Sequence, residues 1–203
     1  VDKLKELGLE KRTLVFFSSD NGPWYGGSTG GLRGMKAMPT EGGIRVPFVI
    51  SWPGKLKPGV YDKPVLQLDA SVTALVAAGI SVRPEWQLDG VDLMPYLVGK
   101  QPGAPHAALY WRFGEQMAIR EGDFKLVRYD TTAEGSSEPV VSRPKLYNLA
   151  ANIGETEDLA ADMPDKVAAL SAKWQRWNTT LPKPLWGRAE GKKAAKKKSK
   201  AAK

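Results

Sequence analysis

The sequence predicts an α/β protein in which an open sheet with helices on its faces is followed by a small antiparallel sheet packed by a helix. Strand-like apolar runs, a long glycine-rich loop and a helical segment succeed one another over residues 13–78, and this order is typical of an open α/β sheet. After about residue 100, short strand-like segments alternate with turn residues, which indicates an antiparallel meander. An amphipathic segment over residues 164–177 predicts the helix that packs on this second sheet.

The first elements of the chain are predicted to be a helix and a strand. Residues 1–9 place leucines at helical spacing among charged residues and include Gly8, which predicts the last turns of an amphipathic helix. Residues 13–18 form a continuous apolar run, as expected for a strand buried on both faces. We expect this strand to stop at Asp20-Asn21-Gly22-Pro23, which is a strong turn signal.

A loop, a second strand and a longer helix follow. The loop covers residues 24–43 and is rich in glycine, and the second strand is predicted over residues 46–52. Residues 65–78 predict a helix that is capped near Asp69 or one turn earlier and ends at Gly79.

The second half of the chain is predicted to form a small α+β domain. Its strands are expected over residues 108–112, 116–120, 124–129 and 145–149. Its helix carries an apolar side formed by Val167, Leu170, Trp174 and Trp177. We therefore expect three parts, namely the end of an α/β core at residues 1–100, a small α+β domain at 101–181 and a basic tail at 182–203.

The formal net charge of +8 is concentrated at the C-terminus. Residues 188–203 hold eight Lys or Arg residues and one Glu, so they carry +7 and leave the other 187 residues near +1. A segment rich in Ala, Lys and Ser cannot bury apolar surface, which predicts a disordered tail. Such a tail can bind nucleic acid or an anionic surface. A solubilising or merely tolerated tail is the simpler interpretation, so we do not expect a nucleic-acid partner.

The composition excludes several classes of protein. The absence of cysteine excludes a disulfide framework, a thiolate zinc site and a cysteine nucleophile. The sequence holds no run of about 18 apolar residues, so no membrane span is predicted. It also shows no secretory signal pattern.

Asp20 and Asn21 are candidate metal ligands because of their chemistry and their position. They follow a predicted strand, and open α/β sheets bind ligands at the ends of their strands. A carboxylate next to an amide oxygen suits Ca²⁺ or Mg²⁺ better than zinc or copper. Taken alone, the same residues also form an ordinary turn, just as Lys36 alone is an ordinary solvated loop lysine.

Several motifs occur together in one order and spacing. They are Ser19-Asp20-Asn21-Gly22-Pro23, Leu32-Arg33-Gly34-Met35-Lys36, Glu41-Gly42-Gly43-Ile44-Arg45-Val46-Pro47 and Trp52-Pro53-Gly54, followed by residues 88–93, 119–127, 146–149 and 154–160. In this order they resemble the second half of the sulfatase family, within the alkaline-phosphatase-like superfamily. The resemblance extends from residue 1 to about residue 180. It implies that the first part belongs to an alkaline-phosphatase-like α/β/α sandwich and that the parent protein hydrolyses an aryl or carbohydrate sulfate ester.

The resemblance also implies roles for single residues. Asp20 and Asn21 match the family pair that supplies two of four protein ligands to a divalent cation, usually Ca²⁺. Lys36 matches the lysine that contacts the sulfate group, where an ammonium group stabilises negative charge as the S–O bond breaks. Trp24 and Tyr25 are candidates for the substrate entrance, with simple packing as the alternative.

Other polar residues of this part are expected to be structural. Three charged residues of the loop are interpreted as an ion-pair scaffold: Arg33, Glu41 and Arg45. The single histidine, His106, lies in a proline-rich linker and is expected to have a structural role.

The chain departs from the sulfatase pattern at the nucleophile. The family uses formylglycine, made from Cys or Ser in a Cys/Ser-x-Pro-x-Arg motif of its N-terminal half. This sequence has no cysteine, and its nearest match, Ser51-Trp52-Pro53-Gly54-Lys55, ends in Lys and falls at a predicted strand end. The other metal carboxylates also lie upstream in the family, and Ca²⁺ takes about six to eight oxygens.

We therefore interpret the chain as the C-terminal part of a sulfatase that is inactive alone and needs the N-terminal half as its partner. The family implies a periplasmic, extracellular or lysosomal parent. A phosphoesterase of the same superfamily, with a Thr or Ser nucleophile and transition metals, is one alternative. A non-catalytic fragment or binding module that acts through the basic tail is another.

Overall fold

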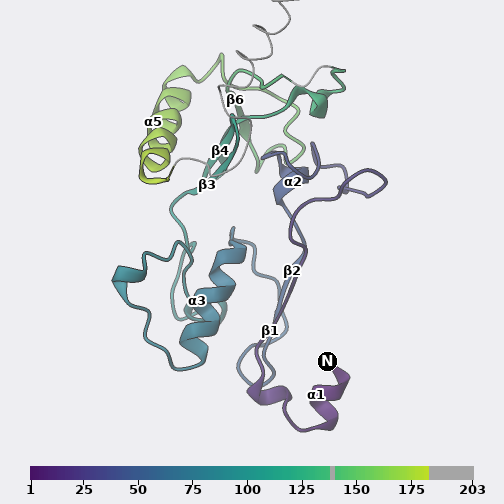
Figure 1. The fold of residues 1–203 in the computed structure, drawn as a ribbon, viewed down its shortest axis with the longest axis vertical. Coiled ribbons are helices and arrows are strands. Elements are labelled where there is room, and N and C mark those ends of the chain that lie inside the picture. The colour runs from purple at the N-terminus through teal and green to yellow at the C-terminus, as the bar shows by residue number, and fades with distance from the viewer. Residues whose placement is uncertain (138–139, 183–203) are drawn as a thin grey trace, which may run out of the picture. The chain divides into compact units, whose positions relative to one another are not determined.

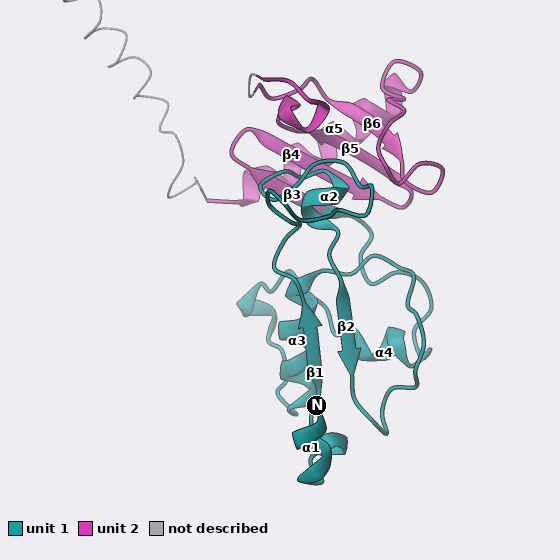
Figure 2. Ribbon diagram, turned by 90° about the vertical axis from the view of Figure 1, so that its right-hand side faces the viewer, with its two compact units in different colours: residues 1–109 teal, residues 110–203 magenta. Residues whose placement is uncertain are grey.

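The computed structural model describes residues 1–137 and 140–182, which belong to two compact units (Figure 2). The first unit is Val1–Leu109 and the second begins at Tyr110. The domain boundary expected near residue 100 stays a prediction. The two compact units divide after Leu109. The predicted basic tail lies, from residue 183 onward, outside the described residues. Within the described ranges, no helix is both long enough and apolar enough to cross a membrane.

The first unit begins with short elements that lead into a two-stranded sheet (Figure 1). Helix α1 spans Asp2–Glu6, and a 3₁₀ turn follows at Glu10–Arg12. Strand β1 covers Val15–Ser18 and pairs antiparallel with β2, Phe48–Ser51. Both strands fall inside their predicted ranges, which confirms the two elements.

The expectation that the first strand is buried on both faces is wrong for the described structure. Phe17 and Val49 are direct partners in the ladder, so both side chains lie on the same face of the sheet. Their exposed fractions are 67% and 54%. Within the described residues, these two side chains are therefore left largely open to solvent. The apolar run therefore predicts the strand correctly but not its environment.

Helix α3, Gln67–Ala77, confirms the helix predicted over residues 65–78. The Asp69 carboxylate accepts a 2.7 Å hydrogen bond from the Leu66 backbone N–H, which caps the first turn. Gly79 follows the helix with a φ of +79°, a conformation that glycine adopts without strain. Shorter helical segments of this unit are α2 at Glu41–Ile44, a 3₁₀ turn at Pro84–Trp86 and α4 at Met94–Leu97.

Asp69 is also the centre of a buried polar cluster. Its side chain is fully buried, and its Oδ1 accepts a 2.9 Å hydrogen bond from the Val91 backbone N–H. The Nε2 atom of His106 lies 2.9 Å from the same oxygen, and His106 is 10% exposed. The carboxylate thus joins the start of α3 to two later segments of the first unit. This contact agrees with the structural role expected for His106.

The second unit contains the predicted meander. Its four-stranded sheet has the order β3-β4-β5-β6, with a 3₁₀ turn at Thr131–Glu134 between β5 and β6. The strands are β3 at Leu109–Phe113, β4 at Gln116–Glu121, β5 at Phe124–Arg128 and β6 at Lys145–Asn148. Sequential neighbours pair antiparallel from β4 to β6.

Helix α5, Pro164–Thr180, packs against β4 and β5 through the apolar side that the sequence predicts. Leu170 is fully buried, and the Trp174 indole N–H donates a 3.0 Å hydrogen bond to the Trp111 carbonyl. The Trp177 ring stacks on Tyr110 with centroids 5.1 Å apart. These contacts confirm that the helix covers the second sheet.

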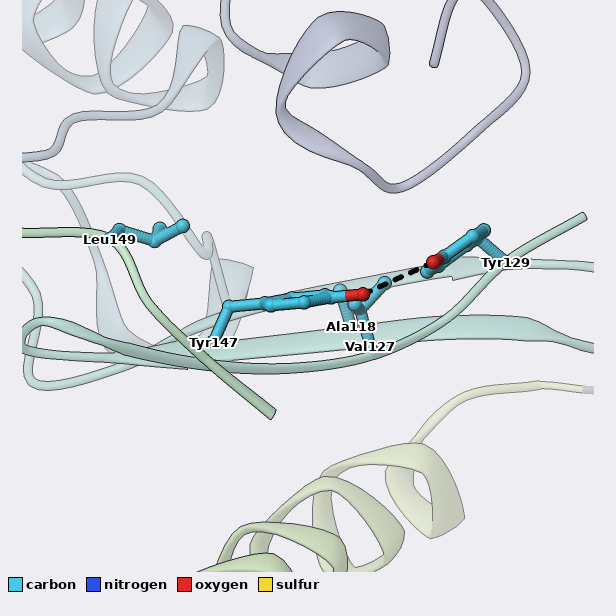
Figure 3. Packing of buried hydrophobic residues seen from close by; sticks show 5 residues of the cluster. All are labelled: Ala118, Val127, Tyr129, Tyr147 and Leu149. Atoms are coloured by element: carbon cyan, nitrogen blue, oxygen red, sulfur yellow. Dashed lines mark hydrogen bonds between the residues drawn. The ribbon is translucent and has the colours of Figure 1, made fainter. Parts of the chain in front are cut away.

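A second cluster of buried residues lies on this sheet (Figure 3). Its members are Ala118, Val127, Tyr129, Tyr147 and Leu149. The hydroxyl oxygens of the two tyrosines are 3.1 Å apart and hydrogen-bonded. The same unit contains an ion pair between Lys125 and Glu155, whose charged atoms are 2.9 Å apart and whose side chains are fully buried.

Candidate functional site

The candidate metal pair lies directly after β1, where the strand ladder ends. Ser18 is the last residue of β1 that pairs with β2, so Asp20 and Asn21 belong to a turn rather than to the sheet. The Ser19 hydroxyl donates a 2.9 Å hydrogen bond to the Asn21 carbonyl and closes this turn. Asp20 is exposed and Asn21 is half-buried. Both side chains can therefore offer oxygen atoms at the surface of the first unit.

A close backbone contact fixes the turn to the start of α2. The Gly22 N–H donates a 2.9 Å hydrogen bond to the Gly43 carbonyl. Gly22 is buried, and a Cβ atom at this position would collide with the Gly42 carbonyl oxygen. Glycine is required here because only a residue without a side chain permits this approach. We call this contact the glycine latch.

The same loop brings the backbone of Lys36 to the turn that carries the candidate metal pair. The Lys36 backbone N–H donates a 2.9 Å hydrogen bond to the Pro23 carbonyl, two residues after Asn21. The Gly42 N–H donates a 2.7 Å bond to the Arg33 carbonyl, so the loop folds back on α2 before it reaches Lys36. The Lys36 side chain is exposed. The structure thus brings the backbone of Lys36 to the turn that carries Asp20 and Asn21.

One ion pair of the loop scaffold that the sequence predicts, between Glu41 and Arg45, is present in the structure. Glu41 opens α2 and is only 3% exposed. An Arg45 guanidinium nitrogen lies 3.5 Å from the Glu41 carboxylate, one helical turn later. Arg33 contributes through its backbone carbonyl, which accepts the hydrogen bond from Gly42. The ion pair and the backbone bonds together hold the ends of the loop.

Trp24 and Tyr25 lie on an exposed turn beside this site. The Gly27 N–H bonds to the Trp24 carbonyl at 3.1 Å and closes the turn. The two rings contact each other edge to face with centroids 4.8 Å apart, and their exposed fractions are 53% and 77%. Their assignment to a substrate entrance stays a prediction.

The candidate site offers some of the groups that could bind a cation and one group that could bind an anion. Asp20 and Asn21 offer hard oxygen donors, and Lys36 offers a positive charge. Across residues 1–137 and 140–182, no group of three or more His, Cys, Asp or Glu residues is placed to hold a metal ion. The two donors fit Ca²⁺ or Mg²⁺ by type, but further oxygens are needed to complete a shell.

The structure adds Gln67, a residue of the site that the sequence interpretation did not include. The Gln67 side-chain amide donates hydrogen bonds to the Ser18 hydroxyl, at 3.0 Å, and to the Ser19 carbonyl. The partners are separated by 48 or 49 positions in the chain. The only local signal was a polar residue in the first turn of a predicted helix, which does not reveal such a partner.

Comparison with known proteins shows which proteins this chain is similar to. Residues 1–80 match the model of the sulfatase family. The chain is 36% identical to arylsulfatase A of Bos taurus over 185 residues, which cover 80% of this chain and 36% of that protein. It is 40% identical to the uncharacterized sulfatase YdeN of Escherichia coli K12 over 114 residues, 55% of this chain and 20% of the relative. Sulfatases are thus its homologues, and the chain spans about a third or less of their length.

Solved structures support the same fold class. The chain superposes on the PsFucS1 sulfatase from Pseudoalteromonas sp. with a TM-score of 0.74 at 24% identity, over 89% of this chain and 39% of that one. It also superposes on the phosphonate monoester hydrolase of Agrobacterium radiobacter with a TM-score of 0.60 at 23% identity, over 88% and 37% of the two chains. The α/β fold expected from the sequence is that of sulfatases and related alkaline-phosphatase-like proteins.

Proposed function

We propose that this chain is the C-terminal part of a sulfatase and contributes one wall of its active site. The observation that supports this proposal is the glycine latch, together with the backbone bond from Lys36 to Pro23, because this bond joins the backbone of Lys36 to the turn that carries Asp20 and Asn21. Homology to sulfatases over four fifths of the chain supports the assignment. The reaction is the hydrolysis of a sulfate monoester to an alcohol or phenol and inorganic sulfate.

In this proposal Asp20 and Asn21 hold part of a divalent cation site, with Ca²⁺ as the cation. The hard oxygens of a carboxylate and an amide fit that ion. When bound, the cation supplies positive charge that polarises the S–O bonds of the ester. Lys36 binds a sulfate oxygen and stabilises the negative charge that grows as the ester bond breaks.

The nucleophile of the proposed reaction lies outside the 203 residues. The sequence has no cysteine, and Ser51 is the last residue of β2, where the Trp52 indole N–H bonds to the Lys11 carbonyl at 3.0 Å. Ser51 therefore sits in an ordinary strand end. We propose that formylglycine and the remaining cation ligands belong to a longer parent protein, and that the 203-residue chain alone shows no turnover.

The substrate class of the proposed parent is an aryl or carbohydrate sulfate, with Trp24 and Tyr25 at the entrance to the site. Exposed aromatic rings beside a charged site suit substrates with flat apolar faces. The proposal also includes a parent that works in the periplasm, in the lysosome or outside the cell.

The experiment that tests this function compares esters that differ only in the transferred group. The parent protein is assayed on 4-nitrophenyl sulfate, 4-nitrophenyl phosphate and a phenyl phosphonate monoester, with EDTA and with added Ca²⁺. Sulfate hydrolysis that EDTA abolishes and Ca²⁺ restores supports the proposal. A preference for phosphate or phosphonate contradicts it and favours the phosphoesterase alternative, since the fold is common to both classes.

A further inference from the structure

The Gln67 side chain connects α3 to the end of β1, immediately before the candidate metal pair. Its Nε2 atom carries two hydrogens and has two acceptors, the Ser18 hydroxyl and the Ser19 carbonyl. The Ser18 hydroxyl in turn donates to the Ser19 carbonyl at 2.9 Å. The carbonyl held in this way belongs to the peptide bond that leads directly into Asp20.

Two anchors therefore enclose the Asp20–Asn21 turn. Gln67 holds the peptide before Asp20, and the glycine latch holds the Gly22 N–H after Asn21. Strand pairing ends at Ser18, so the sheet itself provides no hydrogen bond within the turn. Both anchors act on the backbone that carries the Asp20 and Asn21 side chains.

Gln67 is itself held on a rigid support. It is the first residue of α3, next to Leu66, whose N–H bonds to the fully buried Asp69 carboxylate. That carboxylate also accepts a bond from Val91 and contacts His106. Because the start of the helix is fixed, the hydrogen bonds of the Gln67 amide restrict the movement of the turn.

We propose that Gln67 is a positioning residue for the metal pair and acts through the Ser19 carbonyl. Its effect on cation binding rests on the proposed function, whereas its effect on the turn does not. Partners that orient metal ligands typically change metal affinity by about 10-fold to 100-fold when they are removed. We expect an effect at the lower end of this range, about 10-fold, because the glycine latch remains.

The first test measures hydrogen exchange at the Gly22 amide in the metal-free 203-residue chain. Gln67→Glu keeps the size of the side chain but removes both donors, and Gln67→Ala removes the side chain. Ser71→Ala is the matched control, because Ser71 is exposed on the same helix one turn later. We expect about 10-fold faster exchange at Gly22 in both Gln67 variants and no change in the control. Equal exchange in all four proteins overturns the proposal.

The second test measures Ca²⁺ affinity of the parent protein by titration calorimetry, together with its melting temperature without Ca²⁺. We expect about 10-fold weaker binding in Gln67→Glu, and a smaller loss in Ser18→Ala, which leaves the Ser19 carbonyl as an acceptor. A lower melting temperature with unchanged Ca²⁺ affinity identifies a merely structural contact and overturns the positioning role. If the wild-type parent does not bind Ca²⁺, the proposed function fails, while the exchange result still decides the contact.

Discussion

The two compact units differ in the interactions that stabilise each of them internally. In the first unit, the candidate site is fixed by backbone bonds, above all from Gly22 to Gly43 of α2 and from Lys36 to Pro23. In the second unit, a sheet and a helix enclose an apolar core in which Leu126 and Leu170 have no exposed surface. The first unit relies on polar contacts, exposed ones at the candidate site and a buried one at Asp69, whereas the second relies mainly on apolar side chains removed from water.

The candidate site therefore lies in one unit, while the apolar core enclosed by a sheet and a helix lies in the other. Backbone contacts between glycines fix geometry within narrow limits but bury little apolar surface, which is the main source of stability. Phe17 of the first unit is exposed, whereas the paired strands of the second unit are covered by α5. We therefore expect substitutions in the second unit to change stability without changing the site, and substitutions in the loops to change the site first.

The largest expected effect comes from breaking the buried ion pair of the second unit. Lys125→Ala leaves the Glu155 carboxylate buried without its lysine, and such losses typically cost about 3–5 kcal/mol. We expect a corresponding loss in the free energy of unfolding, measured by urea denaturation with tryptophan fluorescence.

The control for this prediction replaces both charges. Lys125→Met combined with Glu155→Leu removes the uncompensated charge, so we expect it to recover most of the loss. A Lys125→Ala protein as stable as the wild type would show that the second unit does not depend on this pair.

The next effect is catalytic and belongs to the first unit. In the parent protein, Lys36→Ala is expected to lower kcat by roughly 10²–10³, the usual result of losing one preformed group that stabilises developing charge. Lys57→Ala is the control, because Lys57 is also exposed but lies outside this loop. A change in KM with an unchanged kcat would mean that Lys36 only binds the substrate.

Two features of the second unit, its helix and its buried ion pair, differ in how far the sequence predicts them. The helix predicted over residues 164–177, which is α5 at Pro164–Thr180, was predictable because the spacing of Leu170, Trp174 and Trp177 is a local pattern that specifies one apolar side. The ion pair between Lys125 and Glu155 was not. Its partners are 30 positions apart, and nothing local marks a charged residue as buried.

At the candidate site, too, the sequence indicates single residues but not the contacts between distant parts of the chain. The Asp20–Asn21 turn and Lys36 were found by resemblance to sulfatase motifs and by donor chemistry, not by any predicted contact. The bond from Gly22 to Gly43 and the bond from Gln67 to Ser19 join the turn after β1 to α2 and α3, which lie farther along the sequence. Such contacts depend on the tertiary fold, so the sequence could name the candidate residues but not the contacts that position them.

The third prediction concerns the candidate metal pair, Asp20 and Asn21, and tests whether these loop residues bind Ca²⁺. In the parent protein, Asp20→Ala should weaken Ca²⁺ binding by more than about 100-fold, beyond the range for residues that only orient ligands. Asn21→Ala should weaken it less, because an amide contributes a dipole whereas the carboxylate contributes a formal charge. Calorimetric titration gives both affinities.

Thermal melting across a Ca²⁺ series separates this prediction from the simple turn interpretation. A bound cation stabilises the wild type by mass action, so its melting temperature should rise with Ca²⁺ while that of Asp20→Ala does not. An ordinary turn would instead lose stability by an amount that no Ca²⁺ concentration changes. Equal affinities in the wild type and both variants would exclude these residues as ligands.

The smallest expected effect concerns the exposed face of β1 and β2, and it tests whether the first unit is complete by itself. Phe17→Thr combined with Val49→Thr keeps residues that favour strands. Because both positions are exposed in this chain, we expect the free energy of unfolding of the 203-residue protein to change by no more than about 0.5 kcal/mol. Binding of a hydrophobic dye and self-association, measured by light scattering, should both decrease.

The same substitutions should behave differently in the parent protein, where we propose that further strands cover this face. Replacing buried apolar side chains with smaller polar ones typically costs several kcal/mol, so the parent should lose about 2–5 kcal/mol while the isolated chain loses almost nothing. The contrast measures how much residues outside these 203 contribute to covering this face of the sheet. An equally small change in both proteins would mean that the face stays exposed and that the first unit stands without a covering layer.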